Sequence, residues 1–200
     1  MDIIMLQLGK SDKHAQVNVN EGVKRHGDKA LVSLLKEFGQ IHKYDTFDPQ
    51  MMSSLTYEQR KAALNIITMI KEKRDGTIKT RACADGRKQR RYIPKEDVTS
   101  PTIQLESIIM CIIIDAKEGR DVAIADVVGT YLKANMDNFV LVKLTGKTVD
   151  IMCEVSNEYE KFVGIENGKR VLYLRLKKAL YGCMQSAILW YDTFKGYLED

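Results

Sequence analysis

The chain has 200 residues, 44% of them apolar, so it is long and apolar enough to bury a core. Its 3 prolines and 13 glycines exclude a collagen-like or low-complexity polymer. The formal net charge of +4 is compatible with a polyanionic partner without requiring one. The longest apolar run, residues 108–114, is far shorter than the roughly 18 residues of a membrane-spanning helix, so no membrane span is predicted.

Cysteine usage argues against both a zinc knuckle and a disulfide framework, because no C-x-x-C pair or neighbouring histidine occurs. Cys111 lies in the apolar run and is predicted to be a small buried hydrophobe. The first ten residues lack the basic region and cleavage pattern of a signal peptide. We therefore expect an intracellular protein, cytoplasmic or nuclear, that is not secreted.

Two helices are predicted in the first part of the chain. An apolar stripe at helical spacing covers 21–38 and ends at Gly39. A second helix is predicted over 57–74, with Thr56 as N-cap and Gln59 as its capping-box partner. Residues 1–20 are expected to be a poorly defined N-terminal segment, and 21–200 a single domain.

Strands and helices then follow without the regular alternation of a doubly wound sheet, which favours an α+β fold over α/β. Ser100-Pro101 predicts the start of a helix over 102–118, which ends at Gly119. We expect this helix to pack against the strands, because so apolar a helix must be covered on most sides. The other predicted elements are strands at 77–84, 121–127, 139–144 and 171–176, and helices at 154–162 and from 185 onward.

A basic stretch runs from Lys71 to Lys95 and contains only three acidic residues, Glu72, Asp75 and Asp85. This density of cations is typical of a phosphate-binding surface. The alternative is a solvated, flexible surface loop.

The predicted strand 121–127 ends in a candidate site. It places Asp126 on the same face as Val122 and Ile124, where a carboxylate is costly unless a cation such as Mg²⁺ compensates it. Alternatively, Asp126 caps the following turn. Tyr131, five residues later, lies either beside this carboxylate or in the core.

Four segments together resemble the reverse transcriptase domain of copia-type LTR retrotransposons, in the order found in that family. Residues 79–86 are similar to the fingers strand Lys-Ala-Arg-Leu-Val-Ala-Lys-Gly, and 99–102 to Phe-Ser-Pro-Val. Residues 126–132 are similar to the first palm motif, Asp-Val-Lys-Thr-Ala-Phe-Leu. The most specific match is 176–191, which nearly repeats Leu-Lys-Lys-Ala-Leu-Tyr-Gly-Leu-Lys-Gln-Ser-Pro-Arg-x-Trp-Tyr.

The resemblance implies the fingers and front half of the palm of a right-hand polymerase, an RNA-directed DNA polymerase acting on a primer-template and deoxynucleotides. By this resemblance Asp126 is a catalytic Mg²⁺ ligand and Tyr131 is the gate against a ribose 2′-OH. Lys79 and Arg81 reach the triphosphate, and Gln185 lies beside the nucleotide and template. Phosphoryl transfer is mostly positioning and charge neutralisation, which these residue types supply.

The departures from the family pattern are as informative as the matches. The second catalytic motif, Tyr-x-Asp-Asp, does not occur; its expected place is downstream of Trp190-Tyr191, and no thumb segment follows. Asp85 stands where the family has Lys, and Ala187 where it has Pro. We therefore expect a fragment or decayed copy, truncated before the second carboxylate motif and inactive without the rest of the polyprotein.

Two alternatives from other classes remain. The chain is either a nucleic-acid-binding module without catalysis, using the basic stretch, or a host-retained interaction domain in which Asp126 is a relic. Primer extension and salt-dependent RNA binding distinguish the three hypotheses.

Overall fold

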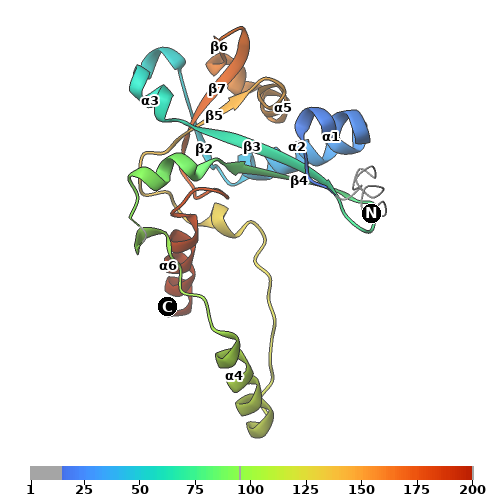
Figure 1. Cartoon of the computed structure of the whole chain (residues 1–200), viewed down its shortest axis with the longest axis vertical. Helices are drawn as coiled ribbons and strands as arrows, with labels where there is room; N and C mark the ends of the chain where they lie inside the picture. Colours follow the sequence, from blue (N-terminus) through green and yellow to red (C-terminus); the bar gives the residue numbers. More distant parts are fainter. Residues whose placement is uncertain (1–14, 95, 200) are drawn as a thin grey trace, which may run out of the picture.

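A computed structural model describes residues 15–94 and 96–199 and shows a mixed α+β fold, which confirms the predicted fold class (Figure 1). Lys95, the last residue of the basic stretch, and most of the segment 1–20 lie outside the described residues. The division of the chain at residue 20 stays a prediction. None of the helices in the described part is long and apolar enough to cross a membrane.

A single mixed sheet organises the described chain. Its seven strands are β1 (Val17–Asn18), β2 (Phe47–Gln50), β3 (Leu64–Glu72), β4 (Ile78–Ala84), β5 (Leu141–Thr145), β6 (Gly164–Glu166) and β7 (Lys169–Leu176). The order is β1-β3-β5-β7-β2, with β4 on β3 and β6 on β7. Only the β3–β5 pair is parallel; the others are antiparallel.

The α-helices are α1 (Val19–His26), α2 (Asp28–Lys43), α3 (Tyr57–Ala62), α4 (Leu105–Glu118), α5 (Lys147–Val155) and α6 (Ser186–Glu199). Short 3₁₀ helices connect them: η1 (Met52–Ser54), η2 (Gly86–Arg91), η3 (Glu96–Val98), η4 (Thr130–Lys133) and η5 (Asn157–Phe162). The predicted helix 154–162 therefore corresponds to the end of α5 and to η5.

The core lies between the sheet and the pair α2–α5, which contact each other. Leu34 and Phe38 of α2, Met152 of α5 and Leu174 of β7 are completely buried in one apolar cluster. The predicted helix 21–38 is in fact two helices, because Gly27 adopts φ +52° between α1 and α2. Glycine adopts this conformation without the steric cost that a Cβ atom brings.

The predicted helix 57–74 is wrong beyond its first turns. The capping box of Thr56 and Gln59 is confirmed, but α3 ends at Ala62 and the chain continues as β3. Isoleucines at 66, 67 and 70 fit a helical spacing as well as a strand. Because residues 66–72 pair with β4, this segment forms a strand rather than a helix.

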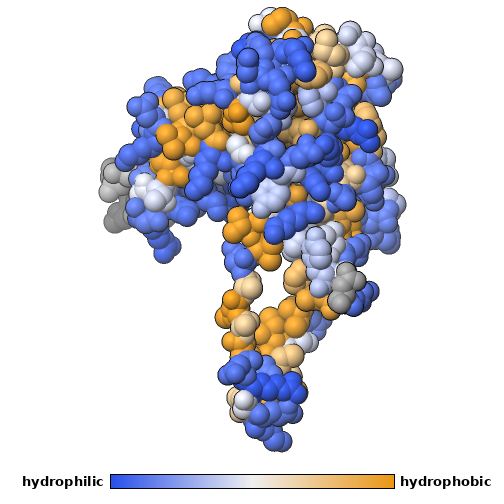
Figure 2. Space-filling view, turned by 180° about the vertical axis from the view of Figure 1, so that it is seen from behind, coloured by the Kyte–Doolittle hydropathy of each residue, from blue (hydrophilic) through white to orange (hydrophobic). Residues whose placement is uncertain are grey.

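The apolar helix is confirmed as α4, ending at Gly119 in the left-handed conformation, but its predicted packing against the strands is wrong. It projects away from the sheet (Figure 1), and Figure 2 shows apolar side chains on this projection. Its isoleucines from Ile108 to Ile114 are 38–55% exposed, and Cys111 is exposed rather than buried. The predicted cap at Ser100 is also wrong, since the helix begins after Gln104.

The strand predicted at 121–127 is wrong as well. This segment leads back from α4 without strand pairing in the described part of the chain, and Ile124 is 99% exposed. An alternating pattern predicts a strand only where a neighbouring strand offers its backbone. The strands predicted at 77–84, 139–144 and 171–176 are confirmed within a few residues as β4, β5 and β7, and the helix from 185 as α6.

Candidate nucleotide-binding site

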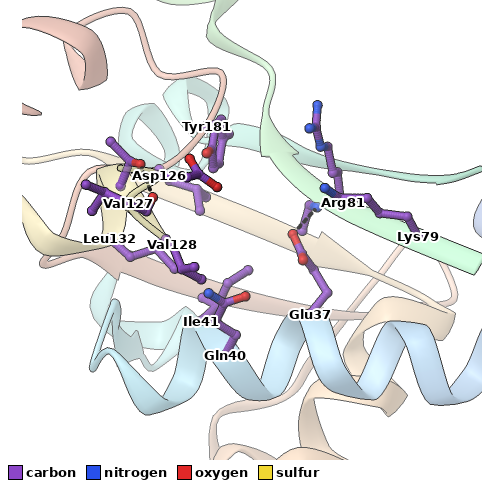
Figure 3. Close-up of a pocket in the computed structure, with 14 residues that line it drawn as sticks. Glu37, Gln40, Ile41, Lys79, Arg81, Asp126, Val127, Val128, Leu132 and Tyr181 are labelled. Carbon is purple, nitrogen blue, oxygen red and sulfur yellow. Dashed lines mark hydrogen bonds between the residues drawn. The ribbon is translucent and has the colours of Figure 1, made fainter. Parts of the chain in front are cut away.

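A recess of about 380 Å³ lies between α2, β4, the segment 126–132 and the turn after β7 (Figure 3). The residues that line it come from the motifs 79–86, 126–132 and 176–182 and from α2. The sequence did not predict that α2 contributes to the site. The lining residues are Glu37, Gln40, Ile41, Lys79, Arg81, Ala82, Asp126, Val127, Val128, Gly129, Thr130, Leu132, Leu180 and Tyr181. Three of the five predicted site residues therefore meet in one recess.

Two cations on β4 supply the positive charge of the recess. Lys79 and Arg81 are two residues apart on the strand, so both side chains leave the same face, and both are exposed. Lys71 lies directly across from Lys79 in the β3–β4 hairpin. Both lysines, together with Lys73 and Arg81, line a small hollow on the hairpin. Like charges opposed across two strands are destabilising, and a bound polyanion would relieve this repulsion.

Asp126 supplies a carboxylate to the same recess. It is exposed and follows the extended segment, and the next turn is closed by the Thr130 hydroxyl, which donates to the Val127 carbonyl at 2.5 Å. No hydrogen bond or ion pair within the described chain engages this carboxylate. The alternative role of Asp126, capping the turn, is therefore wrong, because Thr130 closes the turn.

Glu37 is a charged lining residue that the sequence did not reveal. Its carboxylate accepts a hydrogen bond from the backbone N–H of Ala82 at 3.0 Å and so ties α2 to the strand of Lys79 and Arg81. Burial raises the pKa of Glu37, although the Ala82 N–H and the two cations act in the opposite direction. The available signal was the helical spacing of Glu37, Gln40 and Ile41, which places them on one face.

Tyr131 lies next to the recess rather than in its lining. It belongs to η4 and packs edge-on against Tyr181, with 4.6 Å between ring centroids, and Tyr181 lines the recess. Burial raises the pKa of Tyr181. Tyr181 and Asp126 both line the recess (Figure 3), so this aromatic pair borders the same space as the carboxylate.

Gln185 is not part of the recess. Its amide oxygen accepts from the Asn138 side chain at 2.9 Å, and it lines a separate hollow with Gln89, Tyr92 and Phe139. Gln185 therefore lies in a hollow apart from the recess that Lys79, Arg81 and Asp126 line.

Residues 52–200 match the family described as "Reverse transcriptase (RNA-dependent DNA polymerase)". The chain belongs to this reverse transcriptase family. The resemblance to the copia-type retrotransposon domain is thereby confirmed.

Two curated relatives come from Saccharomyces cerevisiae. The truncated transposon Ty1-A Gag-Pol polyprotein and the transposon Ty1-DR5 Gag-Pol polyprotein are each 26% identical over 182 residues, which is 91% of this chain. The chain spans only 14% and 9% of these two polyproteins. No solved structure matches it significantly.

A glycine contact joins two of the reverse transcriptase motifs. Gly182 adopts φ +88°, and a Cβ atom on it would lie 2.0 Å from the Ala84 carbonyl oxygen. The Ala84 N–H donates to the Tyr181 carbonyl at 2.7 Å, so the turn after β7 lies directly against the end of β4. A Cβ atom on Gly86 would in turn lie 2.1 Å from the Gly182 oxygen.

Not all of the basic stretch is available to a ligand. Arg87 pairs with Asp85 at 2.6 Å, which holds the pKa of that carboxyl below its usual range. Lys88 donates to the carbonyls of Lys61 and Ala63. The departure from the family pattern at Asp85 thus neutralises one arginine, and Lys79 and Arg81 remain the cations that line the recess.

We expect the Glu37→Gln variant to change how stability depends on pH. A carboxyl whose folded pKa is raised binds its proton more readily in the folded state, so its contribution is present at low pH and is lost as pH rises through the folded pKa. Relative to the variant, the unfolding free energy of the wild type should therefore fall as pH rises above 4.5, the ordinary pKa. Urea unfolding of the wild type and the variant, measured at a series of pH values below and above 4.5, checks this expectation.

The glutamine keeps an oxygen that accepts from Ala82, so the variant removes the titration without removing this hydrogen bond. Glu154→Gln, at an exposed position of α5, is the control. A difference between wild type and Glu37→Gln that stays constant with pH would contradict the assignment.

Proposed function

We propose that this chain is a fragment of a retrotransposon reverse transcriptase and that its recess holds the triphosphate of an incoming deoxynucleotide. The observation that supports this proposal is the convergence of Lys79, Arg81 and Asp126, from two separate motifs, on one recess. Lys79 and Arg81 would donate to phosphate oxygens, since cationic clamps neutralise the charge of a transferring phosphoryl group. Tyr131 would limit the space beside the sugar, and Gln185, in a separate hollow, would contact the template.

A Mg²⁺ ion bound with the nucleotide fits the donor set in part. Magnesium is often held by one or two carboxylates together with substrate phosphates and water. Asp126 supplies one such carboxylate with no competing partner in the described chain. Glu37 is engaged by Ala82, and no group of three metal-binding side chains occurs among the described residues. Asp126 would therefore hold a nucleotide-borne Mg²⁺, which would supply charge neutralisation at the phosphates.

The partners in the intact parent would be an RNA or DNA primer-template, deoxynucleotides and the remainder of a Gag-Pol polyprotein. Both curated relatives are much longer proteins of this kind. With such substrates the protein would act inside the cell, in the cytoplasm or the nucleus, and its recess offers charged groups rather than a membrane-binding surface.

The 200-residue chain by itself should not polymerise DNA. The sequence contains no Tyr-x-Asp-Asp, and a two-metal site depends on carboxylates from both motifs. A primer-extension assay with labelled primer-template, deoxynucleotides and Mg²⁺ should show no incorporation above background. Template-dependent incorporation that disappears in Asp126→Asn would refute this expectation.

A nucleic-acid-binding module without catalysis is the second candidate, favoured by the cationic face of the β3–β4 hairpin. Lys71, Lys73, Lys79 and Arg81 line one hollow there. Contacts to phosphates release counterions, so affinity should fall with salt at a slope of about −0.9 per phosphate on duplex DNA and about −0.7 on single strands. Binding of a labelled primer-template with such a slope, and without saturable nucleotide binding, would favour this candidate.

A further inference from the structure

A second recess, of about 500 Å³, lies at a gap in the edge of β3. On this edge, β5 pairs only with Leu64 and Asn65, and β1 pairs only with Met69 and Ile70. Residues 66–68 lie between these pairings and line the recess. The sheet therefore opens here, on an edge that β4 does not use.

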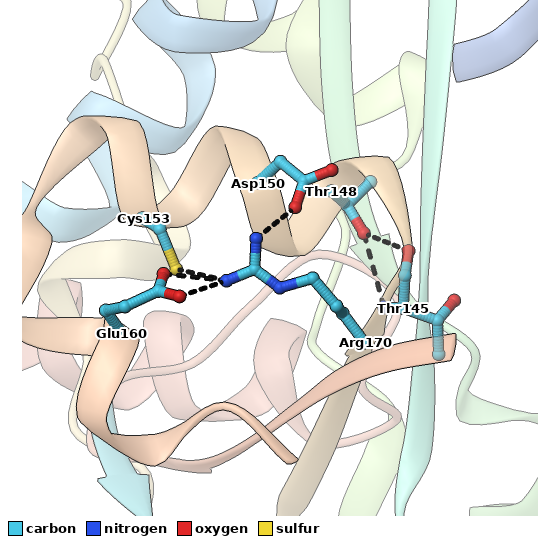
Figure 4. A network of polar contacts seen from close by, with 6 residues as sticks. All are labelled: Thr145, Thr148, Asp150, Cys153, Glu160 and Arg170. Atoms are coloured by element: carbon cyan, nitrogen blue, oxygen red, sulfur yellow. Dashed lines mark hydrogen bonds and ion pairs between the residues drawn. The ribbon is translucent and has the colours of Figure 1, made fainter. Parts of the chain in front are cut away.

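The N-terminus of α5 closes this recess. Gly146 precedes the helix and has no side chain to accept hydrogen bonds from the first N–H groups, those of Lys147 and Thr148. The Thr148 hydroxyl turns back and bonds to Thr145 instead (Figure 4). Because an uncapped helix N-terminus presents N–H donors and a partial positive charge, it attracts anions.

The side chains around the recess add to this positive potential. Lys147 and Lys169 line it, and both are exposed at their positions. No carboxylate is among its described lining residues. Asp150, the acidic residue in the first turn of α5, is paired with Arg170 at 2.6 Å (Figure 4), so its charge is compensated outside the recess.

A buried hydroxyl provides independent evidence for a ligand. Thr68 lines the recess, is only 6% exposed, and its Oγ1 has no hydrogen-bond partner within the described chain. Buried polar atoms without partners are rare in folded proteins, and each calls for an explanation. This Oγ1 is covered by neighbouring atoms, so they would move aside for an oxyanion in the recess to accept its hydrogen bond.

We propose that this second recess binds a phosphate group. Lys147 and Lys169 neutralise the anion, the backbone N–H groups at the start of α5 donate to it, and the Thr68 hydroxyl supplies a further donor. The phosphate belongs either to the backbone of a nucleic acid strand or to a small molecule. This site is independent of the nucleotide recess, because no residue lines both.

Amide signals in the nuclear magnetic resonance spectrum of the full chain test the site directly. Inorganic phosphate, titrated at constant ionic strength, should shift the amides of Lys147 and Thr148 saturably, with a dissociation constant of about 1 mM. The amide at the start of α6 (Ser186) should not shift, which separates the site from a general effect of anions on helix ends.

Two variants test the roles of the lysines and of Thr68 in phosphate binding. Lys147→Gln with Lys169→Gln should weaken phosphate binding about tenfold, and Thr68→Val, which keeps the side-chain shape, about threefold. Lys29→Gln with Lys36→Gln removes the same charge from exposed positions of α2 and should leave the affinity unchanged. The dispersion of the amide signals shows that each variant is folded.

An oligothymidylate of about ten nucleotides and its uncharged methylphosphonate analogue distinguish the sources of phosphate. Shifts at Lys147 and Thr148 with the charged strand alone indicate a strand-binding site, whereas shifts with inorganic phosphate alone indicate a small phosphorylated ligand. The proposal is overturned if neither probe shifts these amides saturably, or if the lysine variant and its α2 control bind phosphate equally. Because this readout does not involve Lys79 or Arg81, its failure leaves the proposed nucleotide site untouched.

Discussion

Gly182→Ala should lower the free energy of unfolding by about 3 kcal/mol or more, one of the largest effects of any single substitution in this chain. Two costs combine at this position. The backbone is at φ +88°, where a Cβ atom is strained, and that atom would lie 2.0 Å from the Ala84 carbonyl oxygen. The turn after β7 would have to move away from β4, taking Tyr181 out of the recess. Urea unfolding followed by circular dichroism measures the change.

Gly76→Ala is the matched control. Gly76 has φ +78°, close to that of Gly182, but nothing lies within 4 Å of its added Cβ atom. Its substitution should cost only the conformational strain, about 1 kcal/mol. If both variants lose the same stability, the close contact between the two motifs does not contribute as described.

The second large effect is expected in binding. Replacing Lys79 and Arg81 together by glutamine should weaken binding of a Mg²⁺–deoxynucleoside triphosphate about 30-fold, because each removed charge loses roughly 1 kcal/mol of interaction with phosphate in a solvent-accessible site. The fold should be unaffected, since both side chains are exposed. The loss should be similar for all four bases, because contacts to phosphate position a nucleotide without reading its base.

Local signals predicted much of the fold. The capping box of Thr56 and Gln59 and the end of α4 at Gly119 each depend on a few neighbouring residues. Such features follow from backbone sterics and side-chain hydrogen bonds within one turn. They could therefore be predicted from sequence alone.

Features that depend on distant partners were missed. The isoleucines at 66, 67 and 70 suit a helix or a strand, and only pairing with β4 makes β3 a strand. The segment 121–127 alternates like a strand but has no partner strand in the described chain. Likewise, the apolar character of α4 shows that it requires a cover without showing where that cover is.

The candidate site likewise contains residues that the sequence could identify and residues that only the tertiary structure reveals. Lys79, Arg81 and Asp126 could be named from the family motifs, and the structure brings them to one recess. Glu37 could not, because its role depends on a hydrogen bond to Ala82, 45 residues away in the chain. Gln185 belongs to a family motif, yet tertiary packing places it in a separate hollow with Asn138.

Titration of the 200-residue chain with a fluorescent deoxynucleoside triphosphate and Mg²⁺ tests the central claim most directly. We predict saturable binding that is weakened about 30-fold in Lys79→Gln with Arg81→Gln, and changed less than about twofold in the α2 control, Lys29→Gln with Lys36→Gln. Omitting Mg²⁺, or replacing Asp126 by asparagine, should also weaken it. Affinity that is the same in the wild type and the Lys79/Arg81 variant would contradict the assignment of this recess to the nucleotide.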